Sequence, residues 1–229
     1  MAKTYAIAID GPAGAGKSTI AKAAAQELGF VYVDTGAIYR TVGLAAARRG
    51  YAPDAHDLVI AMLPELHIDM RYVDGVQRMF LNDEDVSEEI RTPAASSYAS
   101  NVAAIPEVRT YLMDMQRRMA REYDVLMDGR DIGTVVLPNA QLKIFLTASA
   151  EERARRRYKQ LMEKGTDQDY ETVLAEIIER DKRDMERETA PLKQAEDAVL
   201  LDTSNLDKAG SIAAVIALVQ ERRNEGANN

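Results

Sequence analysis

Apolar runs alternate with amphipathic stretches along the first part of the chain. Residues 5–9 form a continuous apolar run, which is typical of a strand buried on both faces of a parallel sheet. Residues 18–28 have helical spacing, residues 31–34 form a second short apolar run, and residues 37–49 have helical spacing again. Strands that alternate with helices favour a parallel sheet with right-handed crossovers, so we expect an α/β fold.

A different pattern interrupts this alternation at about residues 63–92. Residues 67–72 and 77–81 have the composition of strands, and Asp74-Gly75 between them is a strong signal for a two-residue hairpin turn. An antiparallel pair inside an α/β chain predicts a small inserted lobe.

The α/β pattern resumes after this insertion. Pro93 and Pro106 stand where the first turns of two helices are expected, because proline fits the first helical position. We expect further strands at residues 125–127, 142–147 and 198–201, and further helices at residues 150–164, 170–187 and 208–222.

Composition and charge narrow the classes of function. The 229 residues include no cysteine, which excludes disulfides and thiolate catalysis and suits a reducing cytoplasm. A formal net charge of −8 argues against a broad positive face for nucleic acid. The chain has only two histidines, which argues against metal sites or catalytic sites built on several histidines. The apolar runs are too short to span a bilayer. We therefore expect a cytoplasmic protein that binds neither membranes nor nucleic acid.

A complete phosphate-loop motif follows the first strand. Gly11-Pro-Ala-Gly-Ala-Gly-Lys-Ser18 matches G-x-x-x-x-G-K-[ST] and lies between an expected strand and an expected helix, which is the context that the motif requires. The glycines let backbone amides turn toward phosphate oxygens, Lys17 reaches the β- and γ-phosphates, and the Ser18 hydroxyl suits Mg²⁺. The alternative is a glycine-rich turn that matches by coincidence. The motif in this context predicts ATP or another nucleoside triphosphate.

Asp128 ends the buried run at residues 125–127, where a carboxylate can act on the metal directly or through water. The alternative is an ordinary aspartate that caps a turn at the end of a strand. The chain has no Asn-Lys-x-Asp sequence of a guanine-specific switch, and no residue stands out as a base to activate water. A transferase whose acceptor is already nucleophilic needs no such base.

Two arginines follow strand ends, where ligands bind in open α/β sheets. Thr35 and Arg40 come after the second strand and suit an acceptor phosphate, with Arg40 as a bidentate donor. The alternative is a helix cap, Asp34 or Thr35, with a surface arginine. Arg130 follows Asp128 in the same way.

Charged residues also follow one face of each of the two expected helices at residues 150–187. Arg153, Arg156 and Arg157 share a helical face, and the alternative is a solvated face paired with acidic neighbours. In the second helix a 4,3 spacing passes from apolar to charged residues: Val173, Ile177, Arg180, Asp184 and Arg187. A polar cleft for a charged, hydroxylated ligand explains this change, and so does an exit of the helix into solvent.

These motifs together resemble those of the bacterial-type cytidylate kinases, which are P-loop nucleoside monophosphate kinases. The resemblance runs from residue 7 to about residue 201. It rests on Gly11-Pro-Ala-Gly-Ala-Gly-Lys-Ser-Thr19, Asp34-Thr-Gly-Ala-Ile-Tyr-Arg40, Asp85-Val-Ser-Glu-Glu-Ile-Arg91, Asp128-Gly-Arg-Asp-Ile-Gly-Thr-Val-Val136 and Arg180-Asp-Lys-Arg-Asp-Met-Glu-Arg187. The Asp-Gly-Arg-Asp run and the long insertion are the specific features, since adenylate kinases usually carry Asp-Gly-Phe-Pro-Arg at that strand end. Thr35 stands where serine is common in the family, which keeps the hydroxyl.

The resemblance implies a three-layer P-loop NTPase fold with a parallel core sheet, made as one kinase domain over residues 1–229. The core comprises about residues 1–62, 93–149 and 188–229. The inserted monophosphate-binding lobe comprises about residues 63–92. The helical lid and its flanking helices comprise about residues 150–187, with the mobile part near residues 150–170.

The resemblance also implies site residues. For ATP these are Gly11, Pro12, Ala13, Gly14, Ala15, Gly16, Lys17, Ser18 and Thr19, with Arg153 and Arg157 from the lid. For the acceptor they are Thr35, Arg40 and Arg130 at the phosphate, Tyr39 beside the site, Ser100, Arg109 and Arg187 at the cytosine, Arg180 and Asp184 at the ribose hydroxyls or nearby base edge, and Asp131. Lys17, Asp128, Arg130 and Arg157 are expected to be catalytic, with Mg²⁺ held by Ser18 and Asp128. Taken alone, Ser100 and Arg109 read as surface residues of helices.

The activity that the resemblance implies is transfer of the γ-phosphoryl group of ATP to CMP, and also to dCMP, in pyrimidine nucleotide metabolism. Alternatives are a kinase for another small acceptor, such as UMP or AMP, and a regulatory protein that changes shape with ATP. The missing guanine motif and the acceptor-side arginines count against the regulatory protein. We expect a monomer, because no long apolar heptad seam is present.

Overall fold

The computed structural model describes residues 4–163 and 165–227. Residues 1–3 and 228–229 of the expected core and residue 164 of the expected lid lie outside this description. The chain divides into two compact units. The first unit contains the chain up to Tyr32 and from Glu122 onward, and the second contains Val33–Arg121. In the described residues, no helix is both long and apolar enough to cross a membrane.

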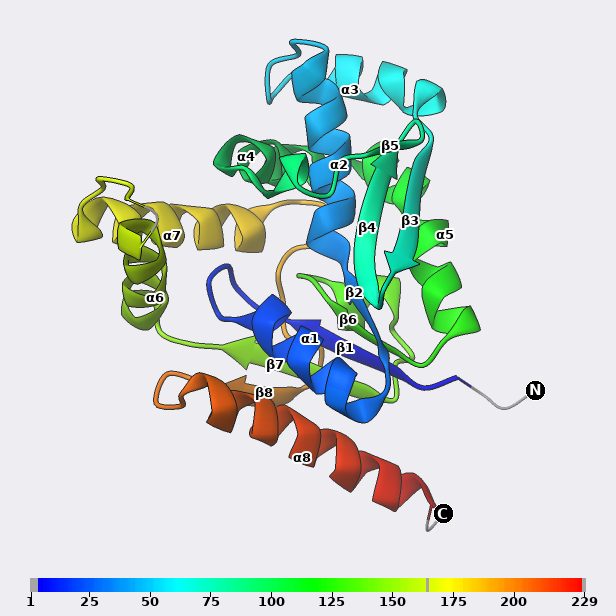
Figure 1. The fold of residues 1–229 in the computed structure, drawn as a ribbon, viewed down its shortest axis with the longest axis vertical. Helices are drawn as coiled ribbons and strands as arrows, with labels where there is room; N and C mark the ends of the chain where they lie inside the picture. Colours follow the sequence, from blue (N-terminus) through cyan, green and yellow to red (C-terminus); the bar gives the residue numbers. More distant parts are fainter. Residues whose placement is uncertain (1–3, 164, 228–229) are drawn as a thin grey trace. The chain divides into compact units, whose positions relative to one another are not determined.

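A parallel five-stranded sheet forms the centre of the first unit (Figure 1). Its strands are β1 (Ala6–Asp10), β2 (Val31–Asp34), β6 (Val125–Asp128), β7 (Leu142–Thr147) and β8 (Val199–Asp202), in the order β2-β6-β1-β7-β8. The boundary between the units falls inside β2. Ile9 of β1 pairs with Asp128 of β6 and with Ile144 of β7. The register therefore brings the residues after β1 and after β6 to the same edge of the sheet.

Helices α1 (Lys17–Leu28) and α8 (Lys208–Ala227) pack against each other in the first unit (Figure 1). Their apolar residues share one core with the sheet, which includes Ile7, Ile9, Ile20, Ala24, Leu126, Leu142, Ile144, Leu146, Val215 and Val219. A continuous apolar strand is stable here because its side chains are removed from water. This core fixes the place where β1 ends and α1 begins.

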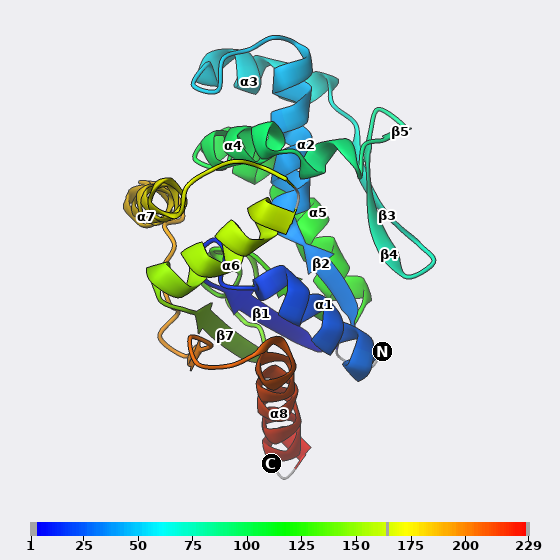
Figure 2. The same ribbon diagram turned by 60° about the vertical axis from the view of Figure 1, so that its left-hand side comes forward.

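Helices α6 (Ala150–Glu163) and α7 (Tyr170–Glu186) form a second, smaller core within the first unit (Figure 2). Ala154 and Leu161 pack against Val173 and Ile177, and the rings of Tyr158 and Tyr170 meet edge to face. The two helices therefore pack against each other through residues of their own.

The second unit combines helices with a three-stranded antiparallel sheet of order β3-β4-β5. Its elements are α2 (Thr35–Arg48), α3 (His56–Met62), η1 (Leu63–Glu65), β3 (Ile68–Val73), β4 (Val76–Leu81), β5 (Glu84–Asp85), η2 (Glu89–Arg91), α4 (Pro93–Val102) and α5 (Pro106–Glu122). The hairpin turn has φ of 52° at Asp74 and 74° at Gly75, as the sequence Asp-Gly predicts. At Gly43, an added Cβ would lie 2.8 Å from the Tyr98 Cβ, so glycine permits the close approach of α2 and α4.

Some expected elements have different limits, and others were not expected. Helix α2 begins at Thr35, two residues earlier than expected, because the Asp34 side chain accepts a hydrogen bond from the Ala37 amide and caps it. Helix α8 continues to Ala227. The pattern gave no signal for α3, for the short edge strand β5, or for η3, a π-helical turn at Ile132–Val136. The predicted limits of core, inserted lobe and lid remain a prediction.

Candidate functional site

The backbone of the phosphate loop fits only because glycine stands at its bends. Gly11 has a φ of 149°, and a Cβ there would lie 1.9 Å from the carbonyl oxygen of Leu146. Gly14 and Gly16 have φ values of 76° and 88°, which glycine adopts without strain. Helix α1 starts at Lys17, so the amide groups of its first turn have no partners inside the helix and suit an anion. The loop has the geometry of a phosphate cradle.

Lys17 bends back over this loop. Its Nζ donates a hydrogen bond to the carbonyl oxygen of Pro12 at 2.7 Å, and the residue is only 5% exposed. Burial lowers the pKa of the Lys17 amine, Arg130 lowers it further, and the carboxylates of Asp128 and Asp10 act in the opposite sense. A bound polyphosphate would favour the ammonium form, because its negative charge would lie beside Nζ.

Ser18 and Asp128, the predicted metal ligands, meet beside the loop. The Ser18 Oγ donates to Asp128 Oδ2 at 2.9 Å, and the Tyr32 hydroxyl donates to Asp128 Oδ1 at 2.9 Å. A hydroxyl and a carboxylate are hard oxygen ligands that fit Mg²⁺. Among the described residues, no group of three or more acidic, histidine or cysteine side chains is arranged to hold a metal ion, so an ion here would take its remaining ligands from phosphate and water.

Asp184 of α7 and Arg187, which follows this helix, form ion pairs with the loop after β6. Arg130 Nε donates to Asp184 Oδ2 at 2.9 Å, and Asp184 is only 6% exposed. Arg187 lies 3.4 Å from Asp131 Oδ1 and donates to the carbonyl oxygen of Ala190 at 2.7 Å. The alternative that this face of α7 leaves the protein for solvent is therefore wrong at Asp184.

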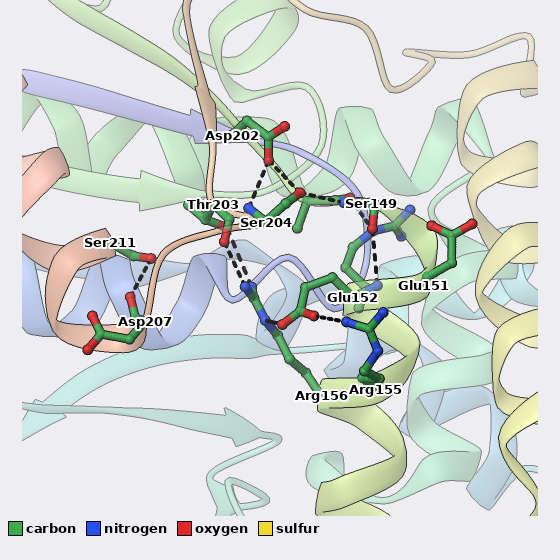
Figure 3. Close-up of polar contacts among 12 residues, drawn as sticks. Ser149, Glu151, Glu152, Arg155, Arg156, Asp202, Thr203, Ser204, Asp207 and Ser211 are labelled. Atoms are coloured by element: carbon green, nitrogen blue, oxygen red, sulfur yellow. Dashed lines mark hydrogen bonds and ion pairs between the residues drawn. The ribbon is translucent and has the colours of Figure 1, made fainter.

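The three arginines of α6 have three different environments. Arg153 is 5% exposed, and it donates to the carbonyl oxygen of Ala13 in the phosphate loop at 3.0 Å and to Asp181 Oδ2 at 2.6 Å. Arg156 donates to the carbonyl oxygen of Thr203 at 2.8 Å and to Glu152 at 3.0 Å (Figure 3). Arg157 is exposed. The solvated alternative describes Arg157 and fails for Arg153.

The start of α6 is fastened to the segment after β8. The Ser149 amide donates to the Ser204 Oγ at 3.0 Å, and Ser204 is held in turn by Asp202 (Figure 3). The Ser149 Oγ accepts from the Glu152 amide at 3.1 Å, which caps the helix. Together with the hydrogen bond of Arg156 to Thr203, these contacts attach the first turns of α6 to the segment that follows β8.

The second unit holds the residues that were predicted after β2. Asp34 caps α2, as the alternative expected. Arg40 is half-buried and not at the surface, and its Nη2 donates to Asp34 Oδ2 at 2.9 Å. Thr35 and Tyr39 are buried in α2. The guanidinium of Arg109 lies 5.6 Å from the centre of the Tyr39 ring, and its Nη1 donates to the carbonyl oxygen of Ala103 at 3.2 Å.

Two helix residues of this unit were expected on the surface from the residues alone. Arg109 is buried, because the Tyr39 ring and the Ala103 carbonyl hold its guanidinium inside the unit, so that expectation was wrong. Ser100 is half-buried on α4. In the first unit, Arg180 is half-buried on α7.

Three residues that the structure places at the site were missed in the sequence. Tyr32 contacts Asp128, Asp181 contacts Arg153, and Asp10 contacts the backbone after Asp131. Tyr32 and Asp10 lie in strands that read as structural, and Asp181 is off the 4,3 spacing of α7. The order of the strands would have indicated Tyr32, since β2 lies next to β6.

The comparisons with known proteins agree with one another. The family model described as Cytidylate kinase matches residues 7–221. A cytidylate kinase of Caldicellulosiruptor bescii is 52% identical over 96% of this chain and 95% of its own length. One of Exiguobacterium sp. is 51% identical over 96% and 99%, and one of Streptococcus equi subsp. equi is 47% identical over 96% of each chain.

A solved structure supports the fold alone. A gluconokinase from Sinorhizobium meliloti 1021 matches with a TM-score of 0.51 at 13% identity, covering 99% of this chain and 98% of that one. The α/β architecture with a parallel sheet was therefore predicted correctly.

Proposed function

Since the chain belongs to the cytidylate kinase family, we propose that the residues described above are the parts of its reaction. The protein is a nucleoside monophosphate kinase that phosphorylates CMP with ATP. One observation carries the proposed site: the ion pair of the half-buried Arg130 with the buried Asp184 joins the loop after β6, next to the proposed metal residue Asp128, to helix α7. This ion pair supports the proposal that the acceptor-side charges Arg130 and Asp184 lie near the ATP side within the first unit.

The phosphate loop holds the triphosphate of ATP. Its backbone amides and the start of α1 face the β- and γ-phosphates, and Lys17 turns from the Pro12 carbonyl to these oxygens. Ser18 and Asp128 hold Mg²⁺, which neutralises phosphate charge when it is bound. Tyr32 keeps Asp128 oriented through its hydroxyl. Lys17 then stabilises the charge that develops on the transferred phosphoryl group.

The acceptor has to be oriented for the reaction, but it needs no general base to activate it. A phosphate oxygen of CMP is already anionic at neutral pH and attacks the γ-phosphorus in line. Arg130 grips the phosphate of CMP through the fork of its guanidinium. Thr35 and Arg40 are the further residues proposed for this phosphate. Asp34 and Asp184 hold Arg40 and Arg130 in the required rotamers.

The residues proposed for the nucleoside part of CMP are those that the family resemblance implies. Ser100, Arg109 and Arg187 contact the cytosine, Arg180 and Asp184 contact the ribose hydroxyls or the nearby base edge, and Asp131 holds Arg187. Tyr39 flanks the acceptor and fixes Arg109 through its ring. dCMP is a second acceptor.

Closure of the helical segment within residues 150–187 excludes water, which would otherwise accept the phosphoryl group. Arg157, which is exposed on α6, reaches the phosphates on closure. Arg153 acts at the ATP phosphates through the Ala13 backbone or by direct contact. The antiparallel sheet within residues 63–92 belongs to the lobe that binds the monophosphate. We also propose that the protein is a monomer in the cytoplasm and that it binds neither nucleic acid nor membranes.

A panel of acceptors tests the proposal. ADP release would be measured with CMP, dCMP, UMP and AMP for the wild type and for Arg130→Lys, with Arg155→Lys as the matched control on an exposed arginine. We expect release with CMP and dCMP above UMP and AMP, with a loss in Arg130→Lys alone. An equal effect of both variants would remove Arg130 from the site.

A further inference from the structure

Asp10 is the last residue of β1, and the chain enters the phosphate loop at the next residue. It is only 5% exposed, although it carries a carboxyl group. Its Oδ1 accepts a hydrogen bond from the Ile132 amide and its Oδ2 accepts one from the Gly133 amide, both at 2.7 Å. A residue beside the ATP loop therefore binds backbone that lies 122 and 123 positions further along the chain.

The two amides that Asp10 binds are the first two of η3, the π-helical turn at Ile132–Val136. The opening amides of a helix need partners from outside it. Among the described residues, the one at the cap position of η3, Asp131, provides no side-chain cap for it. Asp10 thus caps η3 from another strand, as Asp34 caps its own helix α2 from within the same segment.

The loop that this cap fixes carries Arg130 and Asp131. Arg130 pairs with Asp184 and Asp131 pairs with Arg187, so both ion pairs depend on where the backbone of residues 129–131 lies. The Gly133 position is tight: a Cβ there would lie 3.0 Å from the Cδ of Lys143 and 3.4 Å from Asp10 Oδ2. The cap and the loop are packed with little room to shift.

We propose that Asp10 is a positioning residue for phosphoryl transfer: it holds the loop with Arg130 and Asp131 at a fixed place relative to the phosphate loop. The attacking oxygen of the acceptor and the γ-phosphate of ATP are aligned because one side chain ties the two loops together. This inference rests on the proposed function, which gives Arg130 its role at the acceptor phosphate.

The chemistry of a carboxylate is needed for this cap. Its two oxygens accept from two amides at once, whereas an asparagine would turn its NH₂ group toward one of the two N–H groups. The charged groups that face Asp10 are Lys17 of α1 and Asp131 of the loop after β6. Lys143 of β7 lies next to Gly133, and its amine forms an ion pair with Asp197. Burial raises the pKa of Asp10 to about 6, so the cap is ionised at neutral pH despite its cost.

The test is Asp10→Asn, with Asp207→Asn as the matched control. Asp207 accepts from the Gly210 amide at 2.7 Å near the start of α8, and it is exposed. We expect Asp10→Asn to reduce kcat/KM for CMP roughly tenfold or more and to leave the Kd for ATP within about twofold. Amide hydrogen exchange of residues 129–137 is expected to become faster in Asp10→Asn and to stay unchanged in Asp207→Asn.

Gly133→Ala provides a second variant if Asp10→Asn fails to fold. It keeps the carboxylate and crowds the cap, so we expect the same direction of change in exchange and in kcat/KM for CMP. Unchanged exchange in residues 129–137 of a folded variant would overturn the proposal. Equal losses for ATP and CMP would also overturn it, because the role of Asp10 would then belong to the phosphate loop alone.

Arg130→Lys, measured in parallel, distinguishes this inference from the proposed function. A loss of CMP use in Arg130→Lys with a normal Asp10→Asn variant overturns the role of Asp10 and leaves the proposed function standing. Normal CMP use in Arg130→Lys removes the proposed role of Arg130 at the acceptor phosphate, and the inference about Asp10 falls with it.

Discussion

The phosphate loop and the acceptor-side charges are built in opposite ways. The loop is one continuous segment, Gly11–Ser18, whose backbone makes the site and whose glycines leave room for it. The acceptor-side charges of the first unit are side chains from distant segments, such as Arg130 with Asp184 and Asp131 with Arg187. A site made by the backbone can therefore be predicted from one contiguous motif. A site made by side chains can be predicted only when the fold that brings these side chains together is known.

The strongest test of the backbone site is Lys17→Ala. Removing the buried amine over the loop should lower kcat on the order of a hundredfold to a thousandfold if Lys17 has the role that we propose, which is to stabilise charge in the transition state. Steady-state ADP release measures it, and Lys22→Ala on the exposed face of α1 is the control. Near-normal turnover in a folded Lys17→Ala variant would contradict the assignment of the ATP site.

Asp184→Ala tests the side-chain site with a smaller expected effect. It removes the buried partner of Arg130 and a proposed contact to CMP, so kcat/KM for CMP should fall roughly tenfold to a hundredfold. Separate titrations of ATP and CMP are the measurement, with Glu179→Ala on the exposed side of α7 as the control. Equal, small changes for both nucleotides would show that Asp184 has no special role at the acceptor.

Arg130→Lys sharpens the same comparison while it keeps the charge. An ammonium group cannot replace the two parallel donors of a guanidinium, so we expect a loss of about tenfold in kcat/KM for CMP. Steady-state kinetics with CMP varied at saturating ATP measures this loss. Unchanged kinetics would make Arg130 a structural partner of Asp184 only.

The smallest expected effect concerns stability and pH. The pKa of Asp10 is about 6 in the folded protein, above the usual range near 4 of an unfolded aspartate. The folded state binds more protons than the unfolded state between these values, so this group lowers the stability as the pH rises from about 4 to about 6. Below that window this group contributes on the order of 1–3 kcal/mol to the free energy of unfolding, and the contribution is lost fully above it.

Urea unfolding of the wild type and of Asp10→Asn between about pH 4 and about pH 7, which covers the titration and the level range above it, measures that contribution. The stability of the wild type relative to the variant should decline as the pH rises to about 6 and then stay level. A constant difference across the range would show that Asp10 does not titrate in this window.

Much of the fold could be predicted because it follows local patterns. The buried run of β1, the proline at the start of α4 and the Asp74-Gly75 turn each act through neighbouring residues. Strand β5 has two residues and forms only because β4 offers an edge, which no local pattern records. The π-helical turn η3 depends in the same way on Asp10 from a distant strand.

The site shows the same limit. Ser18 and Asp128 could be named together because Ser18 belongs to the phosphate-loop motif and Asp128 ends a predicted strand. The structure puts them within hydrogen-bond distance, and their role at a metal stays a prediction. Arg109 read as a surface residue because its ring partner, Tyr39, is 70 positions away in the sequence. Asp181 was missed, since its partner Arg153 lies on another helix.

The attachment of α6 limits how far this part of the chain can swing. Three donors of Arg153 are engaged by Ala148, Ala13 and Asp181, and Arg156 is bound to Thr203. In the closure that we propose, the pivot therefore lies beyond Arg156, and the moving arm is the outer end of α6 with the start of α7 that packs on it. A short arm has little conformational freedom to lose on each closure, so opening and closing demand little ordering of the chain. The energy of ATP binding is then left mainly for alignment of the two nucleotides.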